Sequence, residues 1–439
     1  MSSRDEATAA DEAAGDLAGD AEGASTRGLS PWAAFAYRDF TMLWLGNVSA
    51  TVTQQMRILV SAQWLYDTTG SAAQLGLLGA VQLLQMPVVL YGGALADNAD
   101  RKKLMIMTQA VAFGMLVALT VLALSDRLET WHIFAVTGLS GMFNMIGNPA
   151  RQAMVSRVVP RSHIAHAVST NTATFQISGI VAPLLFILMF EVFGAGAAFA
   201  VATSMAGISV IAPFLISVSG APQGGSRPTG IASIVEGWRF VFSHKILPGL
   251  YLMDIGVTIV SFYRMLFPIF ADQLYGLGAA GVGLLNIANS LGGVAGTVIV
   301  LRTAAMKHKG KIVLVATLAY AILLFAFGLN RIFLLGLVIV ALLGAADAVG
   351  MVMRQTVVQL TTPDKLLGRA SSAHSFSAMA ANNVGQMEVG VMSGLIGAGN
   401  TMVIGGVVSV LVVMAIWQFI PGVRKYEYTE SDPNVPPPA

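Results

Sequence analysis

The chain alternates between long apolar runs and short polar connections. Twelve such runs follow one another between residues 41 and 421, and a membrane-spanning helix needs ~20 mainly apolar residues. The runs are continuous, whereas the strands of a membrane barrel would alternate in ~10-residue pieces. We therefore predict an all-α polytopic membrane protein with twelve transmembrane helices. The expected spans are 41–66, 72–96, 103–125, 131–158, 164–190, 195–218, 246–272, 279–304, 311–330, 332–360, 366–394 and 398–421.

The composition indicates a protein that lives in lipid. Of the 439 residues, 55% are apolar and 11% are charged, whereas soluble domains carry about 25% charged residues. The chain has no cysteine, which excludes disulfides, thiolate metal sites and cysteine catalysis. The sequence offers no nucleophile–base constellation, no nucleotide-binding loop and no basic surface with interleaved aromatic residues. We therefore expect neither an enzyme nor a nucleic-acid-binding protein, and no metal or cofactor.

Positive residues lie mainly on one side of the predicted spans. Twelve spans place both termini on the same side, and nineteen of the 25 Lys and Arg residues fall in the tails and connections of that side. Only Arg127 and Arg331 fall in connections of the other side. Because Lys and Arg accumulate in cytoplasmic loops, we predict that both termini are cytoplasmic. The expected location is the cytoplasmic (inner) membrane of a bacterium, and we expect a monomer.

Polar segments divide the chain into two halves. Residues 1–38 form an acidic tail whose low hydrophobicity is typical of disorder. The longest connection, 219–245, opens with a Gly/Pro/Ser-rich stretch and continues as an amphipathic segment with Trp238 suited to the membrane interface. We predict an N-terminal six-helix bundle over 39–218, a C-terminal six-helix bundle over 246–421 and a cytoplasmic tail over 422–439.

The two predicted bundles repeat each other in sequence. A shift of 203 residues places Arg151 on Arg354 and a shift of 207 places Arg57 on Arg264. The same two shifts pair Asn144 with Asp347 and Asn47 with Asp254, so amides in the first repeat stand where the second has carboxylates. Two parallel six-helix repeats are typical of transporters whose substrate site lies at the repeat interface near the middle of the membrane.

Polar residues form a stripe on the first span and on its repeat, the seventh. At 100° per residue, Asn47, Gln54 and Arg57 share one face of the first span, and the equivalent positions share one face of the seventh. A polar stripe on a transmembrane helix faces a bundle interior or a watery cavity. We therefore predict a substrate cavity lined by Asn47, Gln54, Arg57, Asn144, Asp254, Ser261, Arg264 and Asp347.

The connection after the second span carries a recognisable motif. Its sequence is Gly93-Ala94-Leu95-Ala96-Asp97-Asn98-Ala99-Asp100-Arg101-Lys102-Lys103. It resembles the G-x-L-A-D-x-x-G-R-[KR] loop signature of the major facilitator superfamily, with Asp100 in place of the usual glycine. More narrowly, Arg264–Asp272, Thr362–Arg369 and Glu236–Phe240 resemble segments of the enterobactin-exporter branch and of related multidrug and macrolide exporters. The resemblance covers roughly residues 35–420 and implies the superfamily fold of two pseudo-symmetric six-helix bundles.

The resemblance also implies a conformational role for this loop. In the superfamily, the aspartate at the position of Asp97 lies near the start of the eleventh helix, and the arginine at the position of Arg101 joins a charge network. A carboxylate at a helix N-terminus gains roughly 0.3–1 kcal/mol from the helix dipole. We therefore expect Gly93, Asp97, Arg101 and Lys102 to form a latch that holds the two bundles together in the outward-facing state.

Charges inside the spans need a partner or a task, because an ionised side chain at the bilayer centre costs ~2.5 kcal/mol or more. We expect Arg57 and Arg264 either to act on substrate or in a gate, or to form a permanent ion pair, with Glu388 as the acidic partner. Arg151 and Arg354 lie near helix ends, and we expect them to reach the interface.

Carboxylates that could carry protons occur only in the predicted spans of the second repeat. We predict Asp254 as the first proton carrier, followed by Glu388 and Asp347. Four arginines against three acids leave the interior slightly positive, which suggests an acidic substrate.

These patterns predict a secondary transporter that exports a small, acidic or amphiphilic molecule, such as a siderophore-like metabolite or a drug, by alternating access and proton antiport. Its expected partners are this substrate, protons and the lipid bilayer. Proton-coupled uptake of a small organic solute is an alternative, since one fold serves both directions. A membrane receptor or scaffold without transport activity is a further alternative.

Overall fold

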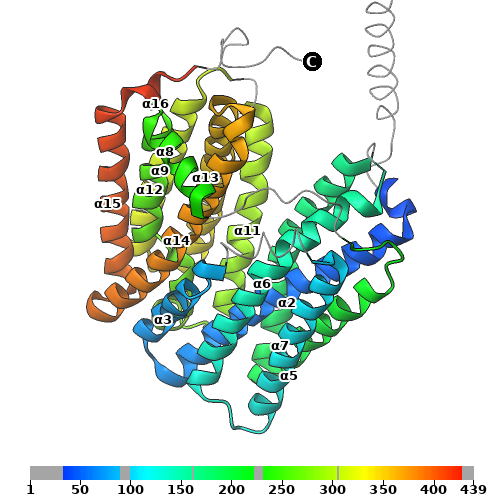
Figure 1. Cartoon of the computed structure of the whole chain (residues 1–439). Helices are drawn as coiled ribbons and strands as arrows, with labels where there is room; N and C mark the ends of the chain where they lie inside the picture. Colours follow the sequence, from blue (N-terminus) through cyan, green and yellow to red (C-terminus); the bar gives the residue numbers. More distant parts are fainter. Residues whose placement is uncertain (1–32, 89–98, 161–162, 222–230, 304–305, 428–439) are drawn as a thin grey trace, which may run out of the picture.

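Figure 1 shows the computed structural model of the chain, which describes residues 33–88, 99–160, 163–221, 231–303 and 306–427. These residues form helices and no strand, as predicted. Seven of the described helices are long and apolar enough to cross a membrane. One of them, His166–Phe214, has 49 residues and would measure about 73 Å if straight. This is more than twice the ~30 Å of a hydrocarbon core, so the helix has the length of two crossings.

The N-terminal half contains five long elements. After a short turn, η1 (Ala33–Ala36), they are α2 (Arg38–Thr69), α3 (Ala72–Leu83), α5 (Arg101–Leu124), α6 (Thr130–Val158) and α7 (Ile164–Phe214). The predicted fifth and sixth spans are joined in α7, which changes direction at Gly194 with φ 79°. Because glycine adopts positive φ without steric cost, a single residue replaces the expected connection. Helix α3 ends at Leu83, where two 3₁₀-type hydrogen bonds, from Leu84 and Gln85, follow.

The C-terminal half follows the linker helix α8 (Ile231–Ser243). Its helices are α9 (Leu247–Val260), α10 (Phe267–Ile269), α11 (Gly278–Thr303), α12 (Lys309–Leu329), α13 (Phe333–Thr361), α14 (Asp364–Ile396), α15 (Ala398–Phe419) and α16 (Pro421–Lys425). Short turns η3 (Tyr263–Leu266) and η4 (Phe270–Leu274) flank α10. Together with the first half, the arrangement is consistent with twelve crossings.

The seventh span, predicted as one continuous helix over 246–272, is broken. Ser261 and Phe262 leave the helical conformation, and the chain continues as η3, α10 and the π-helical turn η4. Pro268 has no N–H, and its ring clashes with the carbonyl four residues earlier, here that of Arg264. At the break, the carbonyl of Ser261 accepts hydrogen bonds from the backbone N–H of Tyr263 at 2.6 Å and from Tyr320 Oη at 3.1 Å. Side-chain hydrogen bonds of this kind make irregular backbone tolerable at membrane depth.

The sequence repeat is visible in the packing of the two halves. In one buried cluster, Phe40 and Leu43 of α2 pack with Met154 and Val155 of α6. The positions that the repeat pairs with these four form part of a buried cluster in the second half, namely Leu247, Leu250, Val357 and Val358. The first and fourth helices of each half therefore meet at equivalent residues.

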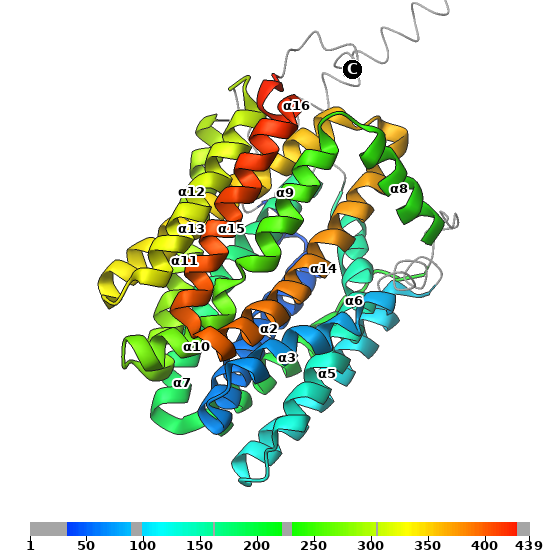
Figure 2. The same ribbon diagram turned by 90° about the vertical axis from the view of Figure 1, so that its left-hand side faces the viewer.

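The halves contact each other on one side of the molecule. We call the side where α2 begins the termini side. In Figures 1 and 2, α3 lies against α14 where the two halves meet. Among the described residues, the hydrogen bonds between the halves run from the middle of the spans to the opposite side. They join Ser290 to Gly179, Gln82 to Gln386, Gln273 and Asp272 to Tyr66, and Ala280 to Glu191. This pattern is that of a transporter open toward its termini side.

Candidate functional site

A cavity of about 170 Å³ lies between the halves. Side chains of α2, α3 and α6 form one wall, and Met265 of η3 and residues of α14 form the other. Its lining is rich in amides and contains one charged side chain, that of Arg57. The lining residues are Gln54, Arg57, Ile58, Ser61, Ala62, Leu78, Gln82, Gln85, Thr137, Gly141, Asn144, Met145, Met265, Met379, Asn383 and Gln386.

Arg57 is buried, with 8% of its surface exposed. Its Nη1 donates to Thr137 Oγ1 at 3.4 Å. No carboxylate lies within 4.0 Å of its guanidinium among the residues that the structure describes. Two members of the predicted polar stripe, Gln54 and Arg57, face this cavity as the helical periodicity predicted, and Ser61 of the same helix lines it as well.

Sequence reasoning missed most of the amides around Arg57. Gln82 Nε2 of α3 donates to Gln386 Oε1 of α14 at 3.3 Å, which links the two halves. Gln85 Nε2 donates to the carbonyl of Thr137 at 3.5 Å. The available signal was a pair of amides three residues apart within an apolar span, at positions 82 and 85 and again at 383 and 386.

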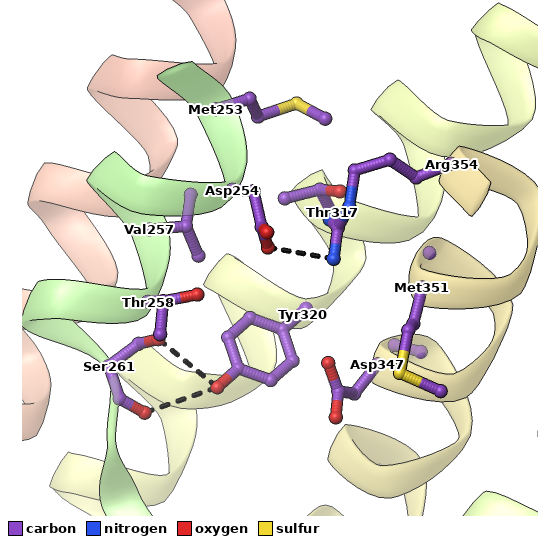
Figure 3. A pocket seen from close by; sticks show the side chains of 12 residues that line it. Met253, Asp254, Val257, Thr258, Ser261, Thr317, Tyr320, Asp347, Met351 and Arg354 are labelled. Carbon is purple, nitrogen blue, oxygen red and sulfur yellow. Dashed lines mark hydrogen bonds and ion pairs between the residues drawn. The ribbon is translucent and has the colours of Figure 1, made fainter. Parts of the chain in front are cut away.

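A second group of charges lies within the C-terminal half (Figure 3). Arg354 Nη2 of α13 and Asp254 Oδ1 of α9 form an ion pair of 2.7 Å, and each side chain is 11% exposed. Our expectation that Arg354 reaches the interface is therefore wrong for this conformation, because the carboxylate of Asp254 holds its guanidinium inside the half. Asp254, the first predicted proton carrier, is thus compensated here.

Asp347 and Arg264 face a common cavity beside this pair. Together with Ser261, Tyr263, Tyr320 and Asn382 they line it. Both charged side chains are exposed to the cavity, and Asp347 interacts electrostatically with Arg264 and with Arg354. Tyr320 Oη contacts Ser261 Oγ at 3.2 Å and its carbonyl at 3.1 Å. The break in the seventh span thus places Arg264 at this cavity, close to the non-helical backbone of Ser261 and Phe262.

Glu388 does not pair with an arginine. No cation lies within 4.0 Å of its carboxylate among the described residues, and its buried Oε2 accepts no hydrogen bond there. Three residues earlier, Gly385 of α14 packs closely against the carbonyls of Thr258 and Ile259. The expectation that Glu388 neutralises Arg57 or Arg264 is therefore wrong in this conformation.

Of the two remaining residues predicted to line the cavity, one does so and the other does not. Asn144 lines the inter-half cavity. Asn47 lies on α2 outside the cavities described above, and its carbonyl accepts a hydrogen bond from Thr51. Arg151 is half-buried on α6, where its Nε is buried without a hydrogen bond and no described carboxylate pairs with it. The expectation that Arg151 reaches the interface is not tested by these contacts.

The predicted latch is only partly within the described residues. Gly93 and Asp97 lie outside them. Lys102 Nζ donates to the carbonyl of Ile216 at 2.6 Å, a contact within the N-terminal half, and the backbone N–H of Arg101 donates to Gly220. Asp100, which replaces the usual glycine, accepts from the backbone N–H groups of Lys102 and Lys103 and so caps the N-terminus of α5.

Comparison with known proteins shows which family has this architecture. The family model for transmembrane secretion effectors, a branch of the major facilitator superfamily, matches residues 29–439. The chain belongs to this family. It is 24% identical over 398 residues to the enterobactin exporter EntS of Shigella boydii serotype 4 (strain Sb227). The aligned region covers 88% of this chain and 92% of that protein.

Solved structures agree on the fold of this secretion-effector chain. A POT family transporter in complex with 5-aminolevulinic acid superimposes with a TM-score of 0.72 at 10% identity, covering 89% of this chain and 97% of that one. A bacterial homolog of the human lysosomal transporter Spinster, in an inward-facing and unoccupied conformation, gives 0.66 at 16% identity, with 90% and 99% covered. The predicted superfamily and fold class are confirmed, and the chain is a multi-pass membrane transporter.

Proposed function

We propose that the protein exports a small acidic or amphiphilic organic molecule across the inner membrane of a bacterium by alternating access. The observation that carries this proposal is the cavity itself. Its wall combines amide and apolar side chains with one arginine, it is shared by both halves, and the halves are joined on the side away from the termini. A substrate reaching the cavity from the termini side would leave on the other side once the contacts between the halves exchange.

Similarity to an enterobactin exporter supports export rather than uptake and favours a siderophore-like molecule or a drug as substrate. The cavity offers amide donors and acceptors with three methionine thioethers, Met145, Met265 and Met379. Such a lining suits a ligand with many oxygen atoms and an apolar body.

Proton antiport is the proposed energy source, and the C-terminal half is its proposed location. Asp254, Asp347 and Glu388 are the carboxylates that lie more than three residues from the end of a predicted span, and they are the proposed carriers, with Asp254 first. In the conformation open to the termini side, Asp254 is paired with Arg354. This is the arrangement expected after a proton has left toward the cytoplasm, since a proton on Asp254 would compete with Arg354.

Transport in inside-out vesicles tests this proposal. Ligands are first found by thermal stabilisation of the purified protein against siderophores, antibiotics and acidic metabolites, because a bound ligand raises apparent stability. An exporter driven by protons accumulates the labelled ligand in vesicles with an acidic lumen. An uptake symporter would move ligand and protons outward instead, and a receptor would give binding without accumulation; either result rejects the proposal.

Asp254→Asn addresses the coupling. We expect this variant to show at least tenfold lower accumulation driven by the pH gradient. It should still be stabilised by ligand. Asp126→Asn, the same substitution in an exposed connection away from the cavities, is the matched control. Gradient-dependent accumulation that survives in Asp254→Asn would exclude this residue as the carrier.

A further inference from the structure

The two repeats carry their buried charge unequally. More than three residues from the ends of its predicted spans, each has two arginines, Arg57 and Arg151 in the first and Arg264 and Arg354 in the second. The spans of the second repeat also contain Asp254, Asp347 and Glu388. All seven acidic residues between 39 and 218 lie outside the predicted spans. The interior of the first repeat is therefore positive, and that of the second is not.

The structure shows how the second repeat neutralises its arginines. Asp254 pairs with Arg354 at 2.7 Å, and Asp347 faces the cavity that Arg264 also lines (Figure 3 shows Asp347 and the pair). The sequence shifts put neutral Asn47 and Asn144 at the positions of these two aspartates in the first repeat. The equivalent clusters at the contact of the first and fourth helices indicate that the repeats are also alike in space. The first repeat thus keeps the arginines and lacks their counter-charges.

Arg57 is the clearest uncompensated charge. It is 8% exposed, lines the inter-half cavity, and among the described residues donates only a 3.4 Å hydrogen bond to a threonine hydroxyl. A buried ion without a partner is strongly unfavourable. Water in the cavity can solvate the guanidinium while the halves are apart. When the halves close over the cavity and expel this water, a counter-charge has to take its place.

We infer that Arg57 is the group that binds the anionic part of the substrate, so that the N-terminal half recognises charge and the C-terminal half does not. This inference rests on the proposed function in one respect, that the inter-half cavity is the substrate site. The planar guanidinium matches a carboxylate with two parallel hydrogen bonds. Gln54, Gln82 and Gln85 lie around the same cavity and would bind carbonyl or hydroxyl oxygens of the ligand. The ligand class is therefore an oxygen-rich organic monocarboxylate or similar anion with an apolar body.

The face of α6 provides the approach to this group. Asn144 and Arg151 are seven residues apart and so differ by about 20° around the helix axis, with Asn148 between them on the same face. Asn144 lines the cavity, and Arg151 lies two turns nearer the termini side. An anion arriving from the termini side would meet Arg151 before it reaches Arg57.

Equilibrium binding to the purified full-length protein tests the assignment. The probes are 1-naphthoate, an amphiphilic carboxylate, and 1-naphthamide, its neutral analogue, with benzoate and acetate as smaller anions. We expect the wild-type protein to prefer the carboxylate to the amide. Arg57→Gln should weaken naphthoate binding about 10- to 100-fold, the range for hydrogen bonds to a charged group, and change naphthamide binding less than about twofold. Arg331→Gln is the matched control, and Arg264→Gln should lose less affinity than Arg57→Gln.

A second variant keeps the test decisive if Arg57→Gln does not fold. Asn144→Asp recreates in the first repeat the carboxylate that Asp347 supplies in the second. It should abolish the preference for naphthoate while raising the thermal stability of the unliganded protein. A carboxylate preference that persists in both variants, or its absence in the wild-type protein for all the anions, overturns the inference. Because binding is measured without any gradient, failed transport alone would count against the proposed function and not against Arg57.

Discussion

At the scale of single residues, the pair of Asp254 and Arg354 combines a structural and a functional role. The two side chains are 2.7 Å apart and almost buried. Removing one partner of a buried pair leaves an uncompensated charge and typically costs about 3–5 kcal/mol, whereas removing both is often nearly neutral. We therefore expect Asp254→Asn and Arg354→Gln each to destabilise the protein by about this amount.

The double variant Asp254→Asn/Arg354→Gln should recover most of that stability. Thermal and chemical denaturation of the four proteins in the same detergent measures the coupling. Independent, additive losses would mean that the pair contributes nothing in solution. The comparison also separates lost proton coupling from lost folding, because the double variant lacks the carboxylate but not the stability.

For single residues, the sequence predicted which side chains face the cavity better than it predicted which charged side chains pair with each other. The 3.6-residue period placed Gln54 and Arg57 on a cavity-facing stripe, and both line the cavity. It did not predict that Arg354 pairs with Asp254 or that Glu388 stays apart from arginine. A pairing depends on how two helices are rotated and shifted relative to each other, and one helix's period carries no information about its neighbour.

At the scale of elements, glycines set how closely the halves approach. A Cβ at Gly79 of α3 would lie 2.5 Å from Gln386 Cβ and 2.7 Å from the carbonyl oxygen of Asn383, both on α14. Overpacking of this kind costs typically 1–3 kcal/mol. We expect Gly79→Val to disfavour the conformation described here and to lower transport at least severalfold.

The control for this prediction is Gly114→Val on α5, where a Cβ would meet nothing within 4 Å. Both changes replace a helical glycine with the same residue, so they share any effect on helix propensity. Transport and limited proteolysis of both variants measure the difference. Equal behaviour of the two variants would show that the close contact of α3 with α14 is unimportant.

Element ends were predictable where the apolar pattern itself ends. The expected spans 103–125 and 131–158 correspond to α5 and α6 within two residues. The break in the seventh span was not predictable from its proline, because Pro149, Pro183 and Pro213 lie inside continuous helices. The break depends on a tertiary contact that the sequence pattern does not show, because Tyr320 on α12 donates a hydrogen bond to the carbonyl of Ser261 at the break.

At the scale of the whole molecule, alternating access predicts that the side from which the cavity can be reached changes during transport. The chain contains no cysteine, so a single introduced thiol reports on one position without background. Gln54 is exposed in the cavity. We expect Gln54→Cys to react with a membrane-impermeant thiol reagent in inside-out vesicles, where the termini side faces the medium, and to be protected in right-side-out vesicles.

Ligand together with a pH gradient should then raise the reactivity of Gln54→Cys in right-side-out vesicles, because the contacts among Tyr66, Asp272 and Gln273 must separate to admit the reagent. Ser125→Cys, in an exposed connection on the opposite side, is the control and should react in right-side-out vesicles under all conditions. It also tests the predicted cytoplasmic position of the termini, because reaction of Ser125→Cys only in inside-out vesicles would reverse that orientation.

If Gln54→Cys stays reactive from one side whatever the ligand and gradient, the two halves do not exchange their contacts. The protein would then be a receptor built on a transporter fold.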